Sequence, residues 1–308
     1  MPMTRAVFLR SLLAGTGMLA AGRWAGVAAQ TEGGRMMTRA IPSTGEAVPV
    51  IGVGTWRGFD VGQNAGSRAR LTHVLQELFD AGGTVIDSSP MYGTSEEVTG
   101  DLLAAMGAQQ KAFVATKVWT SGRDAGTAQM EASSRLLRDD RIELMQIHNL
   151  MDWKTHLPTL RAWKQEGRLQ YLGVTHYRRD AHAELARVIA AQPFDFIQLN
   201  YSVDDRSAEE RLLPLAQERG VAVMVNLPFG GGGLLRKVHA RPLPSWAAEI
   251  GCETWSQVLL KFVLSHPAVT CVIPGTGRPQ HMRENARAGF GELPDEAMRQ
   301  RMIAEIAG

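Results

Sequence analysis

Three apolar runs in the first half of the chain each end in a side chain that could hold or transfer a proton. They end at Asp87, Lys117 and His148, and Tyr92 follows shortly after Asp87. A buried lysine must be paired or lose its proton, so we expect Lys117 to pair with Asp87. An ammonium held beside Tyr92 would favour the phenolate, and the phenol could then exchange a proton near neutral pH. His148 could hydrogen-bond a substrate carbonyl and orient it.

Each of these residues also has an ordinary structural role when it is taken alone. A terminal Asp often caps a turn, a Lys is usually solvated, and a lone His commonly packs in a core. Their convergence favours a catalytic cluster over those roles. A metal-dependent barrel hydrolase is a further interpretation, because the chain has 8 histidines. None of them shows a ligand spacing such as H-E-x-x-H, so we predict no metal site.

The segments that carry these residues alternate between strand-like and helix-like patterns. Near-continuous apolar strands separated by helices are typical of a parallel sheet, and eight of them in about 260 residues predict a (β/α)8 TIM barrel, an α/β fold. Barrel enzymes carry their active sites at the carboxyl ends of the strands, where the four polar side chains would meet. A doubly wound sheet is the rival, but no G-x-G-x-x-G or phosphate-loop pattern is present. The predicted strands are 50–55, 84–88, 113–117, 144–147, 169–174, 196–199, 221–225 and 270–273.

Helical periodicity is clearest at residues 67–81, where five apolar residues from Leu71 to Phe79 share one face. Pro214 lies within the predicted sixth helix and predicts a kink there. Three capping-box patterns predict further helix starts, at Thr94 with Glu97, Ser207 with Glu210 and Thr254 with Gln257.

The composition is that of an ordinary globular protein. Of the 308 residues 44% are hydrophobic and 21% are charged, which excludes disordered, collagen-like and coiled-coil classes. The formal net charge is +2 and no basic block is interleaved with aromatics, so nucleic acid is not an expected partner. Cys252 and Cys271 predict neither a disulfide framework nor a metal site, and we expect two inert buried thiols.

The first thirty residues differ from the rest. Arg5 and Arg10 precede an apolar run of small residues at 11–22, and Val27-Ala28-Ala29 suits a signal-peptidase site. The run is too short for a permanent membrane span. We therefore predict a cleaved export signal at residues 1–29, a lead-in at 30–47 and the barrel at 48–308.

The stretch from Thr4 to Arg10 resembles the twin-arginine export pattern, with Ala6 where the second arginine would stand. By that resemblance the export machinery is a partner and the protein is periplasmic or exported. The alternative is a mis-chosen start codon, and with a leader that does not function the protein would be cytoplasmic.

Seven short motifs occur in a fixed order along residues 41–308: Ile51 to Trp56, Asp87 to Gly93, Ala115 to Lys117, Gln146 to His148, Leu172 to Thr175, Gln198 to Tyr201 and Ile273 to Thr276. Their order resembles that of the aldo-keto reductase family. By this resemblance Asp87, Tyr92, Lys117 and His148 are the catalytic tetrad, with Tyr92 as the general acid. The family transfers a hydride from NADPH to an aldehyde or ketone, so the resemblance implies an NADP-dependent carbonyl reductase that acts on a small molecule.

The same resemblance implies the cofactor contacts. In the family a Ser-Asn pair and a Gln hold the nicotinamide carboxamide, and an aromatic ring stacks on the nicotinamide. Those positions hold Thr175, His176, Gln198 and Asn226 here. Thr175 and Gln198 keep the hydrogen-bonding chemistry, whereas Asn226 cannot stack as a tyrosine would.

Residues 273–285 resemble the family's adenosine-phosphate loop. The usual basic position for the 2′-phosphate is His281 here, and a position often filled by Lys is Gly275. Arg278 and Arg283 are nearby substitutes, and because a guanidinium grips a phosphate with two donors we expect NADP(H) rather than NADH. The remaining expected contacts are Thr276, Glu284 and Asn285.

The expected substrate pocket has apolar walls, which favour an apolar or ring-shaped substrate, although packing is an equally ordinary role for a tryptophan. Residues 229–234 contain four consecutive glycines after the seventh strand, where barrels often bind phosphate, and a flexible surface loop is the alternative. The expected wall residues are Trp56, Met91, Trp119 and Tyr177, and Thr55 and Trp56 are also expected to contact the cofactor.

A rival function is a cofactor- or ligand-binding barrel with little or no turnover. It is motivated by the departures from the family pattern at His176, Asn226 and His281, and by the scarcity of free NADPH outside the cytoplasm. Tight NADPH binding without turnover would favour this rival.

Overall fold

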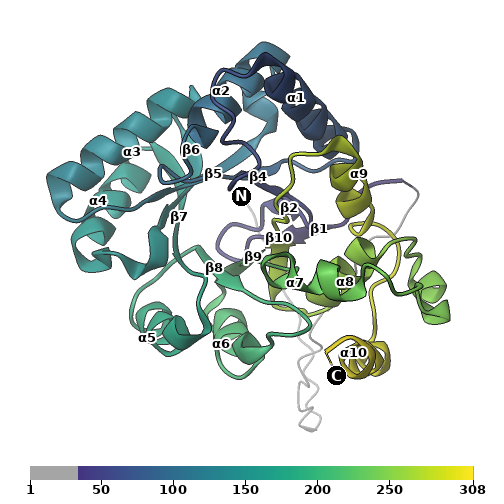
Figure 1. Cartoon of the computed structure of the whole chain (residues 1–308). Coiled ribbons are helices and arrows are strands. Elements are labelled where there is room, and N and C mark those ends of the chain that lie inside the picture. The colour runs from purple at the N-terminus through teal and green to yellow at the C-terminus, as the bar shows by residue number, and fades with distance from the viewer. Residues whose placement is uncertain (1–33, 308) are drawn as a thin grey trace, which may run out of the picture.

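The structure, a computed structural model, describes residues 34–307, so the predicted export signal at residues 1–29 lies outside the described part. Eight parallel strands form one sheet in the order β10-β9-β8-β7-β6-β5-β4-β3. Parallel bridges join Ile51 to Val272 and Gly54 to Gly275, so the two ends of the sheet meet and the barrel closes, with helices around it (Figure 1). The predicted (β/α)8 TIM barrel is confirmed.

All eight predicted strands are present, with small differences at their ends. The first is the shortest, because only two of its residues pair with the next strand while Ile51 and Gly54 bridge to the last part of the sheet. The strands are β3 (Val53–Gly54), β4 (Val85–Asp87), β5 (Phe113–Val118), β6 (Ile142–Ile147), β7 (Leu169–His176), β8 (Phe196–Asn200), β9 (Ala222–Asn226) and β10 (Val269–Val272).

Side chains alternate between the two faces of each strand, which produces two separate cores. The larger one lies between the strands and the surrounding helices. The smaller one fills the barrel, and its centre is a group of three rings, Phe113, Tyr171 and Phe196, with centroids 5.6 to 6.0 Å apart. The other members of the inner core are Ile41, Val48, Val85, Ala115, Leu144, Ala222, Met224, Cys271 and Ile273.

An antiparallel hairpin of β1 (Thr38–Ala40) and β2 (Ala47–Pro49) closes the end of the barrel where the strands begin. Ile41 and Val48 from this hairpin belong to the inner core. The Tyr171 hydroxyl donates to the Glu46 carboxylate at 2.6 Å and lies 2.8 Å from the Thr44 hydroxyl. The sequence predicts only a lead-in at residues 30–47, because three-residue strands are too short to show an alternating pattern.

Ten α-helices surround the barrel in the described residues. The apolar stripe predicted for α1 is confirmed, because all five of its residues from Leu71 to Phe79 are buried, and Asn64 caps the helix by accepting from the Ser67 N–H at 2.8 Å. The helices are α1 (Ala65–Asp80), α2 (Ser95–Met106), α3 (Arg123–Leu137), α4 (Trp153–Gln165), α5 (His182–Ala191), α6 (Leu212–Arg219), α7 (Gly233–Val238), α8 (Trp255–Leu264), α9 (Pro279–Arg287) and α10 (Glu296–Met302).

The predicted helix starts have mixed outcomes. Thr254 caps α8 as predicted. Thr94 precedes α2 but does not cap it, because its hydroxyl donates to Asp60 at 2.9 Å and accepts from the Gly62 N–H at 2.9 Å. These bonds instead tie the loop after β3 to the loop after β4.

The predictions around the sixth helix are corrected. Ser207 opens only the short 3-10 turn η4 (Ser207–Glu209), and α6 itself begins at Leu212. Pro214 therefore lies in the first turn of α6, where a missing N–H removes no helical hydrogen bond, and it causes no kink.

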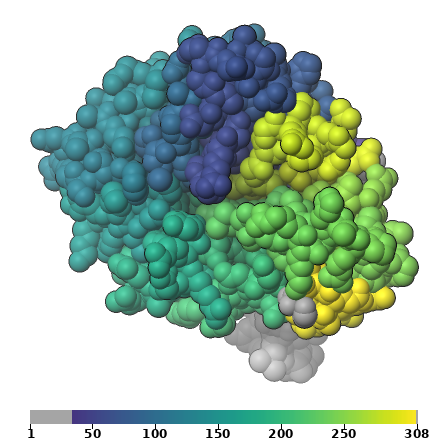
Figure 2. All heavy atoms as spheres, viewed as in Figure 1, coloured from purple at the N-terminus to yellow at the C-terminus, as the bar shows by residue number. Residues whose placement is uncertain are grey.

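Residues from the two halves of the chain lie side by side on the surface. Figure 2 shows the purple N-terminal segment next to the yellow segment that contains α9, in agreement with the packing of α1 against α9. Cys252 and Cys271 are buried free thiols, as predicted, and burial raises the pKa of Cys271 to about 12. Among residues 34–307 no helix is both long enough and apolar enough to cross a membrane.

Candidate active site

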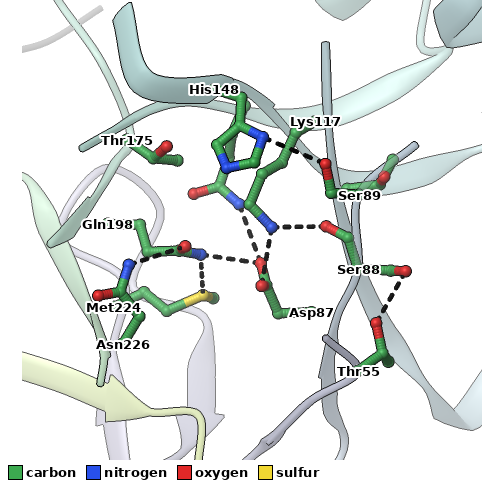
Figure 3. Close-up of polar contacts among 12 residues, drawn as sticks. Thr55, Asp87, Ser88, Ser89, Lys117, His148, Thr175, Gln198, Met224 and Asn226 are labelled. Atoms are coloured by element: carbon green, nitrogen blue, oxygen red, sulfur yellow. Dashed lines mark hydrogen bonds and ion pairs between the residues drawn. The ribbon is translucent and has the colours of Figure 1, made fainter. Parts of the chain in front are cut away.

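The four candidate catalytic side chains meet at the end of the barrel opposite the hairpin. Asp87 ends β4, Lys117 lies next to the end of β5, and His148 directly follows β6. These three strands pair in parallel, so the side chains meet over the inner core (Figure 3). Tyr92 lies in the loop between β4 and α2, and its ring centroid is 5.2 Å from Lys117 Nζ.

Lys117 and Asp87 form the buried ion pair that the sequence predicts. Lys117 is fully buried, and its Nζ donates to Asp87 Oδ2 at 2.8 Å and to the Ser88 carbonyl oxygen at 2.5 Å. The side-chain amides of Gln146 and Gln198 donate to the other carboxylate oxygen at 3.2 and 2.8 Å (Figure 3). Burial alone would lower the pKa of Lys117, but the charge and hydrogen bond of Asp87, together with the charges of Tyr92 and Glu96, outweigh burial and leave that pKa above its ordinary value. Lys117 is therefore an ammonium held in place by Asp87.

Tyr92 has a pKa shifted in the opposite direction to that expected from the sequence. Burial raises the pKa of the phenol above its ordinary value, and the attraction of the Lys117 ammonium offsets burial only in part. The reason is that Lys117 is already paired with Asp87, whose negative charge also disfavours the phenolate. Tyr92 therefore carries its proton at neutral pH, which is the form that a general acid needs.

His148 is a buried neutral imidazole with one ring nitrogen already engaged. Its Nδ1 lies 3.2 Å from the hydroxyl of Ser89, which is itself fully buried (Figure 3). Burial lowers the pKa of His148 to about 2, with a smaller effect from the Lys117 charge. When Ser89 donates this bond, Nε2 carries the ring proton and can donate it to a substrate oxygen. The ring centroids of Tyr92 and Trp119 lie 6.1 and 6.3 Å from that of the imidazole.

Beside this cluster the residues expected to hold a carboxamide form two hydrogen-bonded pairs, which together we call the amide set. Asn226 Nδ2 donates to Gln198 Oε1 at 3.3 Å, and Thr175 accepts from the Asn149 N–H at 3.1 Å. The side-chain oxygens of Asn149 and Asn226 are buried and accept no hydrogen bond from the described residues. Buried acceptors of this kind are costly unless a ligand supplies the donors, so they fit the N–H groups of a nicotinamide carboxamide.

His176 lies further toward the rim of the site. Its ring stacks on Tyr177 with centroids 5.9 Å apart, and its Nδ1 accepts from the Arg178 N–H at 3.2 Å. Thr55, also expected at the cofactor, is buried and donates its hydroxyl proton to Ser88 Oγ at 2.9 Å. The structure therefore places Thr55 in the wall of the site and His176 next to the expected substrate residue Tyr177.

The segment expected to hold the adenosine phosphate begins where the barrel closes and continues into α9. Gly275 bridges to Gly54, and Thr276 Oγ1 accepts from the Arg278 N–H at 3.1 Å. Arg278 is the N-cap residue of α9, is exposed, and has no ion pair among residues 34–307. A guanidinium at a helix N-terminus suits a phosphate. Arg283, the other expected substitute, is instead paired with Glu77.

The remaining expected contacts lie along the same helix. His281 is exposed, Glu284 accepts from Gln280 at 2.9 Å, and Asn285 is buried. Because all three lie on α9, behind Arg278, the structure brings the expected adenosine residues onto one element.

Two of the expected wall residues lie next to the catalytic cluster, with Trp56 beside Tyr92 and Trp119 beside His148. Trp56, Met91 and Tyr177 are 48%, 41% and 47% exposed, whereas Trp119 is partly buried. The Trp56 ring centroid lies 6.5 Å from that of Tyr92. Large apolar side chains that remain exposed together are typical of a binding surface.

Several residues of the site were not identified from the sequence. Ser89 and Gln146 contact His148 and Asp87, and Asn149 and Met224 line the amide set. Gln146 precedes His148 by two residues, so strand alternation could have placed it on the inner face. The glycine-rich loop forms the short turn η5 (Gly230–Gly232) before α7, and Gly230, Gly231 and Gly232 all have positive φ. Within residues 34–307 no group of three or more His, Cys, Asp or Glu side chains is arranged to hold a metal ion.

Comparison with known proteins identifies relatives of this arrangement. The aldo/keto reductase family model matches residues 50–305. Methylglyoxal reductase YeaE of Escherichia coli (strain K12) is 27% identical over 259 residues, covering 82% of this chain and 89% of the relative. An aldo-keto reductase of Strobilurus tenacellus, str7, is 29% identical over 263 residues, covering 72% and 77%. Aldo/keto reductase structures from Klebsiella pneumoniae, solved with NADP and acetate or with NADPH, superpose with a TM-score of 0.73 at 26% identity, covering 85% of this chain and 93% of theirs.

Proposed function

The chain belongs to the aldo/keto reductase family, and from that premise we propose that it uses NADPH to reduce an aldehyde or ketone to an alcohol, with Tyr92 as the general acid. The observation that carries this proposal is the buried Lys117–Asp87 pair, with protonated Tyr92 above it and neutral His148 beside it. The protein is thus an NADP-dependent oxidoreductase of this family rather than a binding barrel without turnover.

The side chains at the mouth can hold the cofactor in two places. The unpartnered acceptors of Asn149 and Asn226 suit the carboxamide, and Arg278 at the start of α9 suits the 2′-phosphate that distinguishes NADPH from NADH. The Klebsiella pneumoniae relatives, which were solved with NADP or NADPH, support this choice. NADPH, when bound, supplies the hydride.

The protein's own residues supply the proton and the orientation. His148 Nε2 donates a hydrogen bond to the carbonyl oxygen, while Ser89 holds Nδ1 and keeps the ring in place. Tyr92 transfers its proton to the same oxygen as negative charge develops there. The phenolate that remains is stabilised by the Lys117 ammonium, which Asp87 holds at 2.8 Å. Proton transfer of this kind typically contributes 10² to 10⁴-fold to the rate.

The test is NADPH oxidation by the protein without residues 1–29, against methylglyoxal and aromatic aldehydes, with Tyr92→Phe as the matched variant. Methylglyoxal is included because the Escherichia coli relative is a methylglyoxal reductase. We expect turnover in the wild type and a loss of about 10² to 10⁴-fold in kcat in the variant, with NADPH binding retained. Tight NADPH binding with no turnover of any carbonyl would contradict the reductase and support the binding barrel.

We further propose that residues 1–29 direct export, by a route that resembles twin-arginine translocation, and that the mature protein is periplasmic. Arg5 and Arg10, the apolar run that follows and the Ala28-Ala29 site support this. The test is fractionation of cells that express the full chain, followed by N-terminal sequencing of the product. A mature chain that begins at Gln30 outside the cytoplasm is expected, and an uncleaved chain in the cytoplasm would show that the leader does not function.

A further inference from the structure

An unpaired guanidinium lies at the mouth of the barrel, next to the wall residue Trp56. The side chain of Arg57 is exposed, and its Cζ lies 4.2 Å from the centroid of the Trp56 ring. Arg57 has no hydrogen bond or ion pair with any residue in the range 34–307. The Trp56 ring is in turn 6.5 Å from the Tyr92 ring. A single indole therefore separates this positive charge from the general acid.

The backbone at Arg57 has an unusual conformation. Its φ is 61°, in the left-handed region that glycine adopts freely and other residues adopt rarely. The turn is tight, because the Gly58 N–H donates to the Trp56 carbonyl oxygen at 2.7 Å, and it is anchored by Phe59, which is fully buried. Residues with a strained backbone persist only where the surrounding structure imposes the conformation, and they cluster at active sites and ligand sites.

Nearby carboxylates do not neutralise this charge, because they have other partners. Asp60, in the same loop, accepts from both the N–H and the hydroxyl of Thr94. Asp180, on the opposite rim, is paired with Arg178. The mouth thus presents an unmatched cation above apolar walls.

We propose that Arg57 recognises an anionic group on the substrate, so that the preferred carbonyl compounds carry a carboxylate or a similar anion on an aromatic or apolar body. This inference rests on the proposed function and names its substrate class. The apolar body packs against Trp56, Met91 and Tyr177, the carbonyl oxygen lies at Tyr92 and His148, and the carboxylate meets the guanidinium. A guanidinium can bind a carboxylate with two parallel donors, and stacking on the indole limits the freedom it loses in doing so.

The test compares two aldehydes of the same shape and different charge, 4-carboxybenzaldehyde and 4-formylbenzamide. We expect wild-type kcat/KM to be about tenfold higher for the carboxylate, mainly through KM, since a hydrogen-bonded pair at a partly exposed site contributes on this scale. The preference should shrink as salt is raised, because the anion and the guanidinium both contact solvent. Arg57→Gln should abolish the preference while leaving kcat/KM for the amide unchanged.

The matched control is Arg123→Gln, which removes an exposed cation at the start of α3, in a different loop of the same face. This variant should keep the preference for the carboxylate. Equal kcat/KM for the two aldehydes in the wild type, or an undiminished preference in Arg57→Gln, would overturn the inference and leave the reductase intact. Turnover of neither aldehyde nor any other carbonyl would mean that the proposed function itself is wrong.

Discussion

The same strands line both ends of the barrel interior, but the side chains at the two ends have different roles. On β5 the inward positions run from Phe113 to Lys117, and on β8 they run from Phe196 to Gln198. At the hairpin end these positions hold packed rings, whereas at the mouth they hold buried ionisable and amide groups. A step of two to four residues along a strand thus separates side chains that stabilise the fold from side chains that act on a ligand. Stability and chemistry should accordingly be separable by substitution.

The largest expected effect is that of Lys117→Met at the mouth. The variant leaves the Asp87 carboxylate buried without its cation, which should cost about 3 to 5 kcal/mol in the free energy of unfolding. It also removes the charge that stabilises the Tyr92 phenolate, so kcat should fall by at least about 10²-fold. Chemical denaturation and single-turnover rates measure the two losses.

A second variant separates the two losses at this position. Lys117→Met combined with Asp87→Asn removes both charges, so most of the lost stability should return while activity should not. Recovery of activity in the double variant would show that the Lys117 charge has no part in the chemistry.

The next effect in size is that of Phe196→Ala at the hairpin end. Removing a fully buried ring from the group of three should cost about 3 to 5 kcal/mol in the free energy of unfolding. Phe196 forms no hydrogen bond with any of the four catalytic side chains. We therefore expect kcat/KM of the folded protein to change by less than about twofold. A tenfold fall in kcat measured below the unfolding transition would break the separation between the two ends.

The smallest expected effect is the contribution of His148, at the mouth, to the pH dependence of the free energy of unfolding. Burial lowers the pKa of His148 to about 2 from an ordinary value of 6.5. Between these values the unfolded chain binds a proton that the folded chain does not, so stability falls as pH drops below 6.5, by up to about 1.4 kcal/mol per pH unit. Urea denaturation at pH 7 and pH 5 should show a shallower fall in His148→Gln. His239→Gln, at an exposed position, should keep the wild-type slope.

Much of the fold could be predicted because barrel strands are buried on both faces and read as apolar runs. The same property made Asp87, Lys117 and His148 stand out, since each follows such a run. The hairpin at residues 38–49 could not be found in this way, because its strands of three residues show no periodicity. Whether Pro214 kinks α6 depends on where that helix begins, and local sequence patterns define helix starts poorly.

The site was predicted in its residues more fully than in its electrostatics. The pairing of Lys117 with Asp87 followed from the cost of burying an unpaired charge. The direction of the Tyr92 pKa did not, because it depends on the balance between burial, Lys117 and Asp87, and that balance requires coordinates. The sequence does not predict Ser89 and Asn149 as site residues, because a serine or an asparagine in a loop has many ordinary roles.

The bridges that join Ile51 to Val272 and Gly54 to Gly275 bear on how the protein is made. A ribosome releases the first strand early and the last strand near the end of synthesis, so the barrel stays an open sheet until almost the whole chain has emerged. Contacts so distant in sequence slow folding, and an open sheet edge invites pairing with other chains in the interval. Loss of the segment after β9 should therefore remove both barrel closure and the proposed phosphate site on α9. We expect chaperones to bind the nascent chain mainly before that segment appears.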